Sequence, residues 1–288
     1  MEGIDLHIHS TASDGTLSPA EIFKLAQKLK LRAIAITDHD TIDGSKEALQ
    51  AGIPPSVKFL TGVEISASSP PSISYAGSFH ILGYSISLDD PQLNKTLAVL
   101  QQARKNRNPQ IVKQLNNMGF EFSLEDVASE IGDGQLGRPH IARYMLKRGF
   151  VKSIDEAFKK YIAQGRPAYV DKYRVDCKRA IEIILDAGGI PVLAHPILLN
   201  FDKNETIKLF SLLKGMGLKG IEVYYPETPP DITAFYIELA KRYGLLKTGG
   251  TDFHGSLKPD IQMGSGRGDF VVPYDIYEKI VRNLNGRS

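Results

Sequence analysis

The chain has 288 residues, of which 42% are hydrophobic and 24% charged, an ordinary globular composition that supplies enough residues for a sizeable core. This composition excludes a disordered, fibrous or disulfide-stapled protein, and the single cysteine, Cys177, excludes an internal disulfide or a thiolate metal cluster. The net charge of +2, from 35 basic and 33 acidic residues, does not indicate a broad basic face, so we expect no stable duplex nucleic-acid partner.

The first residues and the apolar runs predict the compartment. Met1 to His7 contains no basic stretch followed by an apolar run, so we expect no secretory signal. No apolar run approaches the roughly 18 residues that a membrane span requires. We therefore expect a soluble, cytoplasmic protein without a membrane partner.

Short apolar segments alternate with amphipathic ones along most of the chain. Strands are expected at residues 6–9, 33–36, 59–65, 79–86, 190–194, 220–224 and 245–249. Ser18, Pro19 and Glu21 supply the N-cap, the first-turn proline and the capping glutamate of a helix after the first strand. Further helices are expected at 43–51, 180–187, 205–213, 232–243 and 274–284. Apolar strands separated by helices favour an α/β fold with a parallel sheet, closed as a barrel or doubly wound.

Residues 91–168 interrupt this alternation, because helical patterns follow one another there without comparable strands. One pattern runs from Asp90-Pro91 through Leu100, and a second section follows Asn108-Pro109. Others cover 123–131, 139–146 and 153–162. We therefore expect a small inserted helical subdomain at 91–168 and a catalytic barrel formed by 1–90 and 169–288.

Six of the seven histidines lie beside a predicted strand end. His7 and His9 are two apart on one strand, so both rings project from the same face, and Asp252 and His254 repeat this spacing after the last strand. The other candidates that follow or border strands are Asp14, His39, Glu64, His80 and His195. Since the carboxyl ends of parallel barrel strands point to one mouth, we expect these side chains to meet in one cavity.

One closed structural zinc site needs about four ligands, and these imidazoles and carboxylates exceed that number. The set therefore favours two or three divalent ions with open coordination positions. Imidazole and carboxylate ligands fit Zn, Mn or Fe without choosing among them. Asp38 and Asp40 flank His39 and are interpreted as residues that orient imidazoles or shape the turn.

The order His-x-His, Thr-Asp-His, Glu, His, His and Asp-x-His along the chain resembles the PHP (polymerase and histidinol phosphatase) family of metallophosphoesterases. At position 14 this sequence has Asp, where histidinol phosphatases usually carry His. In this respect it resembles the TrpH/YciV-like branch of the family, which contains RNase AM exonucleases and 3',5'-nucleotide bisphosphate phosphatases. The insertion, with Gly137-Arg138-Pro139-His140 and Gly165-Arg166-Pro167, is similar to that branch as well. The resemblance implies a distorted (β/α)7 barrel, which agrees with about seven predicted strands.

The resemblance also implies a ligand set and a reaction. His7, His9, Glu64 and Asp252 would hold one metal, Glu64 would bridge to a second held by His80 and His195, and Asp14, His39 and His254 would hold a third. Mn²⁺ is the first expectation, with Zn²⁺ or Fe²⁺ as alternatives. The implied reaction is phosphate hydrolysis of a 3',5'-bisphosphonucleotide to an AMP-type product, 5'-to-3' exonucleolytic hydrolysis of short single-stranded RNA, or both.

Residues outside the ligand set are candidates for substrate contacts. Two close metals would lower the pKa of a bridging water toward ~7, with Glu64 and Asp252 as catalytic residues. Arg138 suits a phosphate because a guanidinium binds it bidentately, although a surface position before a proline-initiated helix is the alternative. His140 is a candidate phosphate contact or proton donor, with helix capping as its alternative, and Arg166 is a second phosphate anchor or a linker residue.

Other functions remain open at this point. A histidinol-phosphate-type phosphomonoesterase is allowed by the ligands, although Asp14 and the insertion weigh against it. A non-catalytic metal-binding module and an amidohydrolase are further alternatives, the latter disfavoured because no lysine lies at the required strand end. Tyr224 and Tyr225 could stack a base or pack at the rim, and Glu222 could orient a ligand or contact substrate. The small net charge predicts that short substrates are preferred over long ones.

Overall fold

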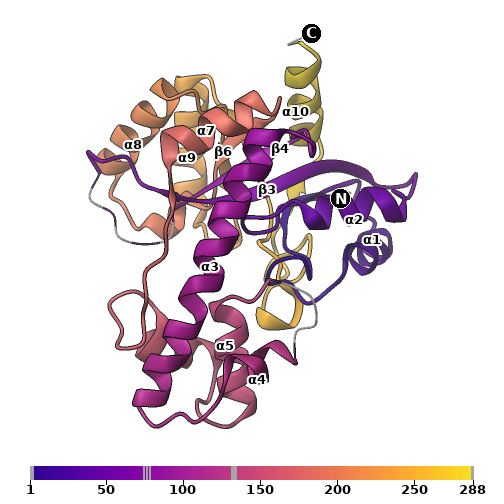
Figure 1. Cartoon of the computed structure of the whole chain (residues 1–288). Coiled ribbons are helices and arrows are strands. Elements are labelled where there is room, and N and C mark those ends of the chain that lie inside the picture. Colours follow the sequence, from indigo (N-terminus) through magenta and orange to yellow (C-terminus); the bar gives the residue numbers. More distant parts are fainter. Residues whose placement is uncertain (1–2, 74, 76, 78, 131–134, 287–288) are drawn as a thin grey trace.

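The computed structural model describes residues 3–73, 75, 77, 79–130 and 135–286. A curved sheet surrounded by helices forms the upper part of the molecule in Figure 1, and a helical unit lies below it at the far end of α3. Within the described residues, no helix is both long and apolar enough to cross a membrane.

All seven predicted strands are present, together with two strands of two residues each. They are β1 (Gly3–Ile8), β2 (Ala33–Ile36), β3 (Lys58–Ser68), β4 (Phe79–Tyr84), β5 (Val175–Asp176), β6 (Ile190–Leu193), β7 (Gly220–Tyr224), β8 (Leu246–Gly249) and β9 (Val272–Pro273). The order in the sheet is β8-β7-β6-β4-β3-β2-β1-β9, and β5 pairs with β3.

The two ends of this strand order approach each other, so the sheet is nearly closed. Ile8, at the end of β1, forms a parallel bridge with Phe253, which follows β8. Gly250 makes the approach possible, because a Cβ at this position would lie 2.3 Å from the backbone nitrogen of His7. The predicted barrel-like α/β fold is therefore confirmed.

The sheet is not parallel throughout, contrary to the prediction from the apolar pattern. Strand β4 pairs antiparallel with both β3 and β6. Only residues 69–78 separate β3 from β4, whereas a parallel return needs a crossover of about a dozen residues or more. The reversal brings the start of β4 beside the carboxyl end of β3.

Helices cover the outside of the sheet. They are α1 (Pro19–Lys28), α2 (Asp43–Ala51), α7 (Cys177–Asp186), α8 (Lys203–Gly215), α9 (Pro230–Tyr243) and α10 (Asp275–Asn285), with the 3-10 turns η2 (Pro196–Leu199) and η3 (Gly255–Leu257). The predicted capping box forms at α1, where the Ser18 side chain accepts from the N–H of Glu21 and the Glu21 carboxylate accepts from the N–H of Ser18.

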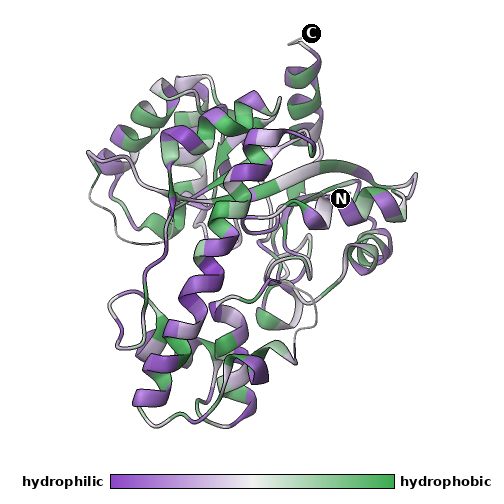
Figure 2. Cartoon of the chain, viewed as in Figure 1, coloured by the Kyte–Doolittle hydropathy of each residue, from purple (hydrophilic) through white to green (hydrophobic). Residues whose placement is uncertain are grey.

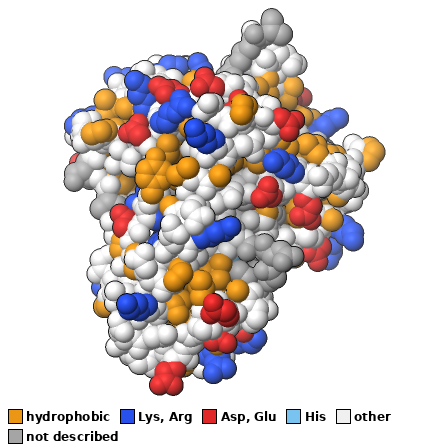
Figure 3. All heavy atoms as spheres, viewed as in Figure 1, with side chains coloured by type: hydrophobic (Ala, Val, Ile, Leu, Met, Phe, Trp, Pro, Cys, Tyr) orange, Lys and Arg blue, Asp and Glu red, His pale blue; other side chains and the backbone are white. Residues whose placement is uncertain are grey.

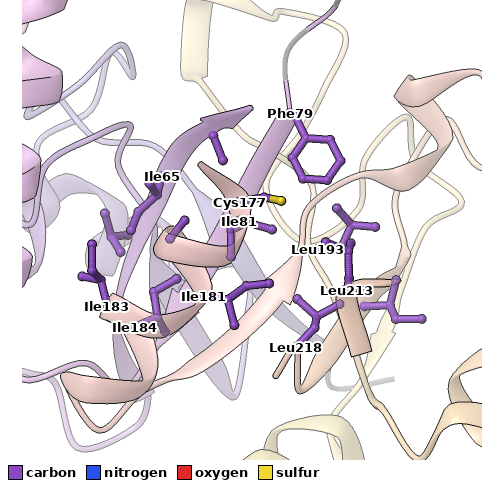
Figure 4. Close-up of a cluster of buried hydrophobic side chains, with 14 of the residues drawn as sticks. Ile65, Phe79, Ile81, Cys177, Ile181, Ile183, Ile184, Leu193, Leu213 and Leu218 are labelled. Carbon is purple, nitrogen blue, oxygen red and sulfur yellow. The ribbon is translucent and has the colours of Figure 1, made fainter. Parts of the chain in front are cut away.

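The main apolar core lies between the sheet and α7. Figure 4 shows Ile65, Ile81 and Leu193 from the strands facing Ile181 and Ile184 of α7, and all five are fully buried. Burying an isoleucine or leucine side chain contributes about 1.5–3 kcal/mol. This packing holds in place the strands whose ends carry the candidate ligands.

Helix α3 (Pro91–Asn117) is continuous, whereas the sequence pattern predicted two sections separated at Pro109. Proline removes one hydrogen bond within a helix, but both ends of α3 are held by apolar packing. Leu97 and Leu100 pack into the core of the barrel, and Ile111 and Leu115 pack into the helical unit. The helix therefore continues through Pro109 and connects the two parts.

The helical unit has its own apolar core. It comprises α4 (Leu124–Ala128), α5 (Arg138–Lys147), α6 (Ile154–Ala157) and the π-helical turn η1 (Phe158–Ile162), packed against the end of α3. Residue 131, the predicted end of the helix that begins near 123, lies outside the described residues. In Figure 2 the middle of α3 is mostly hydrophilic, while the sheet above and the unit below are rich in hydrophobic residues.

Candidate active site

The strand ends bring the predicted ligand side chains to one end of the barrel. His7 lies in β1 and His9 follows it, Glu64 lies in β3, and His195 follows β6. Because β4 is antiparallel to β3, His80 near its start lies at this same end. The segments after β1, β2 and β8 add Asp14, His39, Asp252 and His254.

Glu64 lies at the centre of this cluster and is fully buried. Its Oε1 is 2.8 Å from Nδ1 of His80 and 2.9 Å from Nε2 of His195. Its Oε2 is 2.8 Å from Nδ1 of His39 and 3.3 Å from Nε2 of His9. Two carboxylate oxygens that face different imidazoles can serve two different cations.

Among the described residues, three groups of side chains each bring one donor atom per member within 4.8 Å of the others. They are His7, His9, Glu64 and Asp252; His9, Asp14, His39 and His254; and His39, Glu64 and His80. The first group equals one set implied by the resemblance, and the second contains another with His9 added. His195 is in none of the three, but its Nε2 lies 3.3 Å from Nδ1 of His80.

The donor atoms of this cluster fit a metal ion. Six of them are buried without a hydrogen-bond partner in the described part of the chain: Nε2 of His7 and His9, Nδ1 of His39 and His195, Oδ1 of Asp14 and Oε2 of Glu64. Buried polar atoms are normally paired, so these lone pairs call for a cation. Imidazole and carboxylate donors fit zinc, manganese or iron.

The electrostatics keep the carboxylates ionised. Burial opposes the charged form of Glu64, but the imidazoles of His39 and His80 outweigh it and hold the pKa of Glu64 well below its usual value. Burial of Asp252 is likewise outweighed, first by Lys258, and the pKa of Asp252 also lies well below its usual value. Ionised carboxylates supply the negative charge that a divalent cation requires.

Glu222 of β7 is buried and orients two of the imidazoles. Its Oε1 is 2.9 Å from Nδ1 of His7, and its Oε2 accepts from the backbone N–H of His195 at 2.7 Å. A carboxylate on one ring nitrogen fixes the tautomer and leaves the other nitrogen for a metal. Of the two roles considered from the sequence, these contacts match the orientation of a ligand.

Asp252 is held by two further side chains. Its Oδ2 accepts from the hydroxyl of Tyr225 at 3.1 Å and from Nζ of Lys258 at 2.6 Å. Its Oδ1 faces Nε2 of His9 at 3.1 Å. Tyr225 is buried, and its hydroxyl is taken up by this contact with Asp252. Lys258 is a residue of the site that the sequence reasoning missed.

The two aspartates beside His39 contact serines and cations instead of imidazoles. Asp38 accepts from the N–H of Ser10 at 2.7 Å and from the hydroxyl of Ser13, which fixes the loop after β1. Asp40 accepts from Nη2 of Arg104 and Nζ of Lys172, both at 2.8 Å. Asp40 therefore ties the barrel to α3 and to the segment that returns from the helical unit.

Three residues at this end of the barrel adopt left-handed backbone conformations. The φ angles are 55° for Asp40, 27° for His195 and 54° for Asp252. Such a conformation costs a non-glycine residue about 1–3 kcal/mol and persists where surrounding contacts hold it. Three of the six non-glycine residues with positive φ in the described part of the chain thus lie at this end of the barrel. Two are candidate ligands, and Asp40 follows the candidate ligand His39.

A cavity of about 470 Å³ opens in front of the cluster. Seven of the candidate ligands line it, namely Asp14, His39, Glu64, His80, His195, Asp252 and His254. Pro139, Ile154 and Phe158 form the wall contributed by the helical unit. The volume is that of a small-molecule site, and a ligand here would lie between the barrel and the helical unit.

A smaller cavity of about 120 Å³, which we call the basic cavity, shares Asp14, His39 and His80 with the first. Its walls carry five cationic side chains, Arg104, Arg107, Arg138, Lys172 and Arg174. The outer face in Figure 3 instead mixes basic and acidic side chains. Cations gathered beside candidate metal ligands are the charge pattern that binds phosphate.

The cations of the basic cavity are incompletely neutralised. Asp40 pairs with Arg104 and Lys172, and Asp171 pairs with Arg174. Nε of Arg107 is buried without a hydrogen-bond partner among the described residues. Burial and the charges of nearby arginines lower the pKa of Arg107 to about 9. A bound anion would relieve this excess of positive charge.

Arg138 lies at the start of α5 and is held beside the basic cavity. Its Nη1 donates to the carbonyl of Ile162 at 3.1 Å. Its guanidinium lies 5.7 Å from the ring centre of Phe158 and 5.6 Å from that of Tyr169. A guanidinium has five donor hydrogens, so this arrangement leaves others for a ligand.

His140 and Arg166 are placed differently from each other. Nδ1 of His140 accepts from the N–H of Gly137 at 3.0 Å, which is the capping contact considered as its alternative role. In the neutral ring the proton then sits on Nε2. Arg166 is exposed and lines neither the 470 Å³ cavity nor the basic cavity, as expected of a linker residue.

Sequence reasoning missed four of the five basic side chains, although α3 carries a signal for two of them. Leu97, Leu100, Arg104, Arg107 and Ile111 follow one another at spacings of three and four, so they share one helix face. Arginine is rarely buried without a partner, so two arginines on an otherwise apolar face indicate that this face meets a polar site. Lys172 and Arg174 carry no comparable signal.

The sequence and the fold were compared with those of known proteins. The PHP domain family matches residues 5–187. A 5'-3' exoribonuclease of Haemophilus influenzae is 35% identical over 251 residues, which cover 87% of this chain and 89% of that protein. A 3',5'-nucleoside bisphosphate phosphatase of Chromobacterium violaceum is 31% identical over 255 residues, 88% of each. A structure from Bifidobacterium adolescentis, assigned as a metal-dependent phosphoesterase, matches with a TM-score of 0.85 at 28% identity, covering 98% of this chain and 96% of that one.

Proposed function

Because the chain belongs to the PHP domain family, as its motifs predicted, we propose that it is a metal-dependent phosphoesterase acting on 3',5'-bisphosphonucleotides or on the 5' end of short single-stranded RNA. The observation that carries this proposal is that the ligand cluster and the basic cavity share Asp14, His39 and His80. A cation site and a phosphate site thus adjoin. For such substrates we expect a cytoplasmic enzyme without a membrane partner or a stable duplex nucleic-acid partner.

The ligand cluster would hold two or three divalent ions, with Mn²⁺ as the first expectation. One set comprises His7, His9, Glu64 and Asp252, a second Glu64, His80 and His195, and a third Asp14, His39 and His254. When bound, the ions would lower the pKa of an attacking water and neutralise charge on the phosphoryl oxygens. Glu64 would be shared by two sets, since its two oxygens face different imidazoles.

The chain's own cations would hold the substrate. Arg138, Arg104 and Arg107 line the basic cavity, and their guanidinium donors would bind phosphate oxygens. Fixed positive charge near the reacting phosphate stabilises the charge that develops on it during hydrolysis. Asp252, held by Tyr225 and Lys258, keeps Oδ1 directed at the ligand cluster.

His140 would act as a hydrogen-bond donor to substrate. Its Nδ1 is occupied by the N–H of Gly137, so the neutral ring offers Nε2–H. Burial lowers the pKa of His140, which favours this neutral donor over a charged proton donor to the leaving oxygen. We keep His140 as a substrate contact and leave the general acid unassigned.

We infer that residues 91–168 form an inserted lid over the barrel of 1–90 and 169–288. Two observations support this division. Side chains from Ile111 to Ala168 form an apolar cluster of their own. Pro139 and Phe158 line both the 470 Å³ cavity and the basic cavity. Lids of this kind exclude water from the reacting groups.

The proposal is tested by phosphate release from adenosine 3',5'-bisphosphate with the Mn²⁺-loaded protein. Arg138→Met should raise KM about 10- to 100-fold, because a charged hydrogen bond is worth about 1.5–3 kcal/mol. Arg148→Met is the matched control, since Arg148 is exposed at the end of the same helix. Metal binding by the wild type without release of phosphate or nucleotide from this compound or from a 5'-phosphorylated RNA trimer would overturn the proposal.

A further inference from the structure

A third cavity, of about 750 Å³, is bounded by residues 15–17, the end of α1, residues 253–263 and α5; we call it the α5 groove. Its walls continue directly from the ligand cluster. Gly15 follows Asp14 in the chain, and Phe253 and Gly255 flank His254. The groove therefore begins beside the candidate ligands. Of the residues that line it, the function proposed above uses His140 as a substrate contact and assigns no role to the others.

The walls of the groove combine an apolar surface with one strong cation. Leu17, Leu29, Ile261 and Met263 supply apolar side chains, and α5 supplies Arg143. Within the described residues, Arg143 has no hydrogen bond or ion pair. The one acidic side chain in the described lining, Glu130, is paired with Lys147 at 2.8 Å.

This combination matches the chemistry of single-stranded nucleic acid. Such strands are held by cations on the phosphodiesters and by packing of the bases, chiefly on aromatic side chains, without base-specific hydrogen bonds. The described lining offers Phe253 and the aliphatic wall to the bases and the guanidinium of Arg143 to a phosphodiester. A purely apolar ligand would leave Arg143 unpaired, and a small anion would leave the leucine wall unused.

One wall of the groove is held in place by a contact between two loops. The N–H of Ser256 donates to the hydroxyl of Thr16 at 2.9 Å, which joins the loop after β1 to the loop after β8. Gly255 has φ +64°, and a Cβ there would lie 2.1 Å from the Thr16 hydroxyl oxygen. The close contact of the two loops thus depends on glycine, and it gives the groove a fixed wall next to His254.

The sizes of the cavities indicate how a substrate would be divided among them. The basic cavity, at about 120 Å³, is well below the roughly 300–1,000 Å³ of sites that take a whole small molecule, so it suits an end group such as a terminal phosphate. The groove, at about 750 Å³, lies within that range and is therefore large enough for a nucleoside as well as a phosphate. The ligand cluster adjoins both.

We propose that the α5 groove binds the part of a single-stranded oligonucleotide that lies beyond the scissile phosphate. Its bases pack on the apolar wall, and a phosphodiester is held by Arg143. This inference rests on the proposed function, because that function assigns the scissile phosphate to the ligand cluster. The groove then determines how well oligonucleotides compete with a mononucleotide bisphosphate.

Binding of a 5'-phosphorylated RNA pentamer tests the groove separately from catalysis. The probe carries a 3' fluorescein and phosphorothioate linkages that resist hydrolysis, and fluorescence anisotropy with the Mn²⁺-loaded protein gives its Kd. The groove variants are Arg143→Ala and Leu29→Glu. Their matched controls are Arg148→Ala on the same helix and Leu49→Glu on α2, where Leu49 is 49% exposed against 43% for Leu29.

Each groove variant should raise the pentamer Kd about 5- to 20-fold, the effect of losing one phosphate or stacking contact. The controls should leave Kd unchanged. Arg143→Ala should also reduce the slope of log Kd against log salt by about 0.7, because one fewer phosphate is neutralised. In steady-state assays the loss should be larger for the pentamer than for adenosine 3',5'-bisphosphate.

The results separate this inference from the proposed function. An unchanged pentamer Kd in both groove variants, or equal losses on both substrates, would overturn the inference. Weaker pentamer binding by the variants, combined with a wild type that releases no phosphate or nucleotide, would instead support the groove and overturn the proposed function.

Discussion

Replacement of Asp40 tests most directly how the barrel is connected to α3 and to the segment that returns from the helical unit. Its carboxylate is fully buried and accepts from Arg104, from Lys172 and from the N–H of Ser66. The side chains of Arg104 and Lys172 are 9% and 7% exposed. Asp40→Asn keeps the shape of the side chain but removes the negative charge that both cations share.

The expected cost follows from this burial. Removing one partner of a buried ion pair costs about 3–5 kcal/mol, because the remaining charge is left uncompensated. Burial and the charge of Arg104 lower the pKa of Lys172 to about 7, so Lys172 can release its proton and relieve part of the cost. We expect a loss of about 3 kcal/mol at neutral pH, or a fall in Tm of roughly 6 °C or more at about 2 °C per kcal/mol.

The pH dependence of this loss has a defined sign. Asp40 stabilises the charged form of Lys172, so the pKa of Lys172 falls further in Asp40→Asn. Below pH 7 the wild type keeps the ion pair and the variant lacks it, whereas well above pH 7 Lys172 is neutral in both folded proteins. The unfolding free energy of Asp40→Asn should therefore come closer to that of the wild type as the pH rises through 7.

Urea denaturation of Asp40→Asn and Asp40→Asn/Lys172→Met measures these effects. The double variant should recover part of the loss, because methionine replaces a lysine that without Asp40 must either stay charged in a buried position or give up its proton on folding. Asp155→Asn is the control, since its pair with Lys159 is exposed and worth under about 0.5 kcal/mol. An Asp40→Asn protein as stable as this control, or a double variant that recovers nothing, would refute the reasoning.

Three further predictions concern the site. Glu222→Gln should weaken metal affinity about 10- to 100-fold, because it removes the carboxylate on Nδ1 of His7; competition with a fluorescent chelator measures this, and unchanged affinity would count against the orienting role. Arg107→Leu should raise Tm yet raise KM for adenosine 3',5'-bisphosphate, because it removes a buried cation with an unpartnered Nε; calorimetry and kinetics check both, and a variant with lower Tm and unchanged KM would contradict it. EDTA should lower Tm, and Mn²⁺ at about 100 times its Kd should restore about 2.7 kcal/mol; a melting curve insensitive to metal would contradict the ligand assignment.

The sequence predicts the ligand cluster because its signals are local. His7-Ile8-His9 fixes two rings on one face of a strand, and Asp252 and His254 repeat the spacing after another strand. Since strand ends share one edge, the convergence of these side chains on Glu64 follows from the order of strands alone. The seven strands are predictable for the same reason, because each is a short apolar run between helical patterns.

Three features of the fold and the site could not be predicted from local sequence patterns, because they depend on tertiary contacts. The reversal of β4 is set by the length of the 69–78 connection, which the pattern of apolar residues does not weigh. Helix α3 continues through Pro109 because its two ends pack on different cores. Lys172 enters the site only because Asp40, 132 positions earlier, lies beside it in the fold. No local pattern encodes that distance.

The central claim is that this PHP-family chain hydrolyses phosphorylated nucleotides with metal bound at the ligand cluster. The most direct measurement is product release by the Mn²⁺-loaded protein from adenosine 3',5'-bisphosphate, a 5'-phosphorylated RNA trimer and histidinol phosphate, compared side by side. We expect release of the 3'-phosphate to leave AMP, or stepwise release of mononucleotides from the trimer, and little turnover of histidinol phosphate. Turnover of histidinol phosphate alone, or of none of the three with metal bound, would contradict the claim.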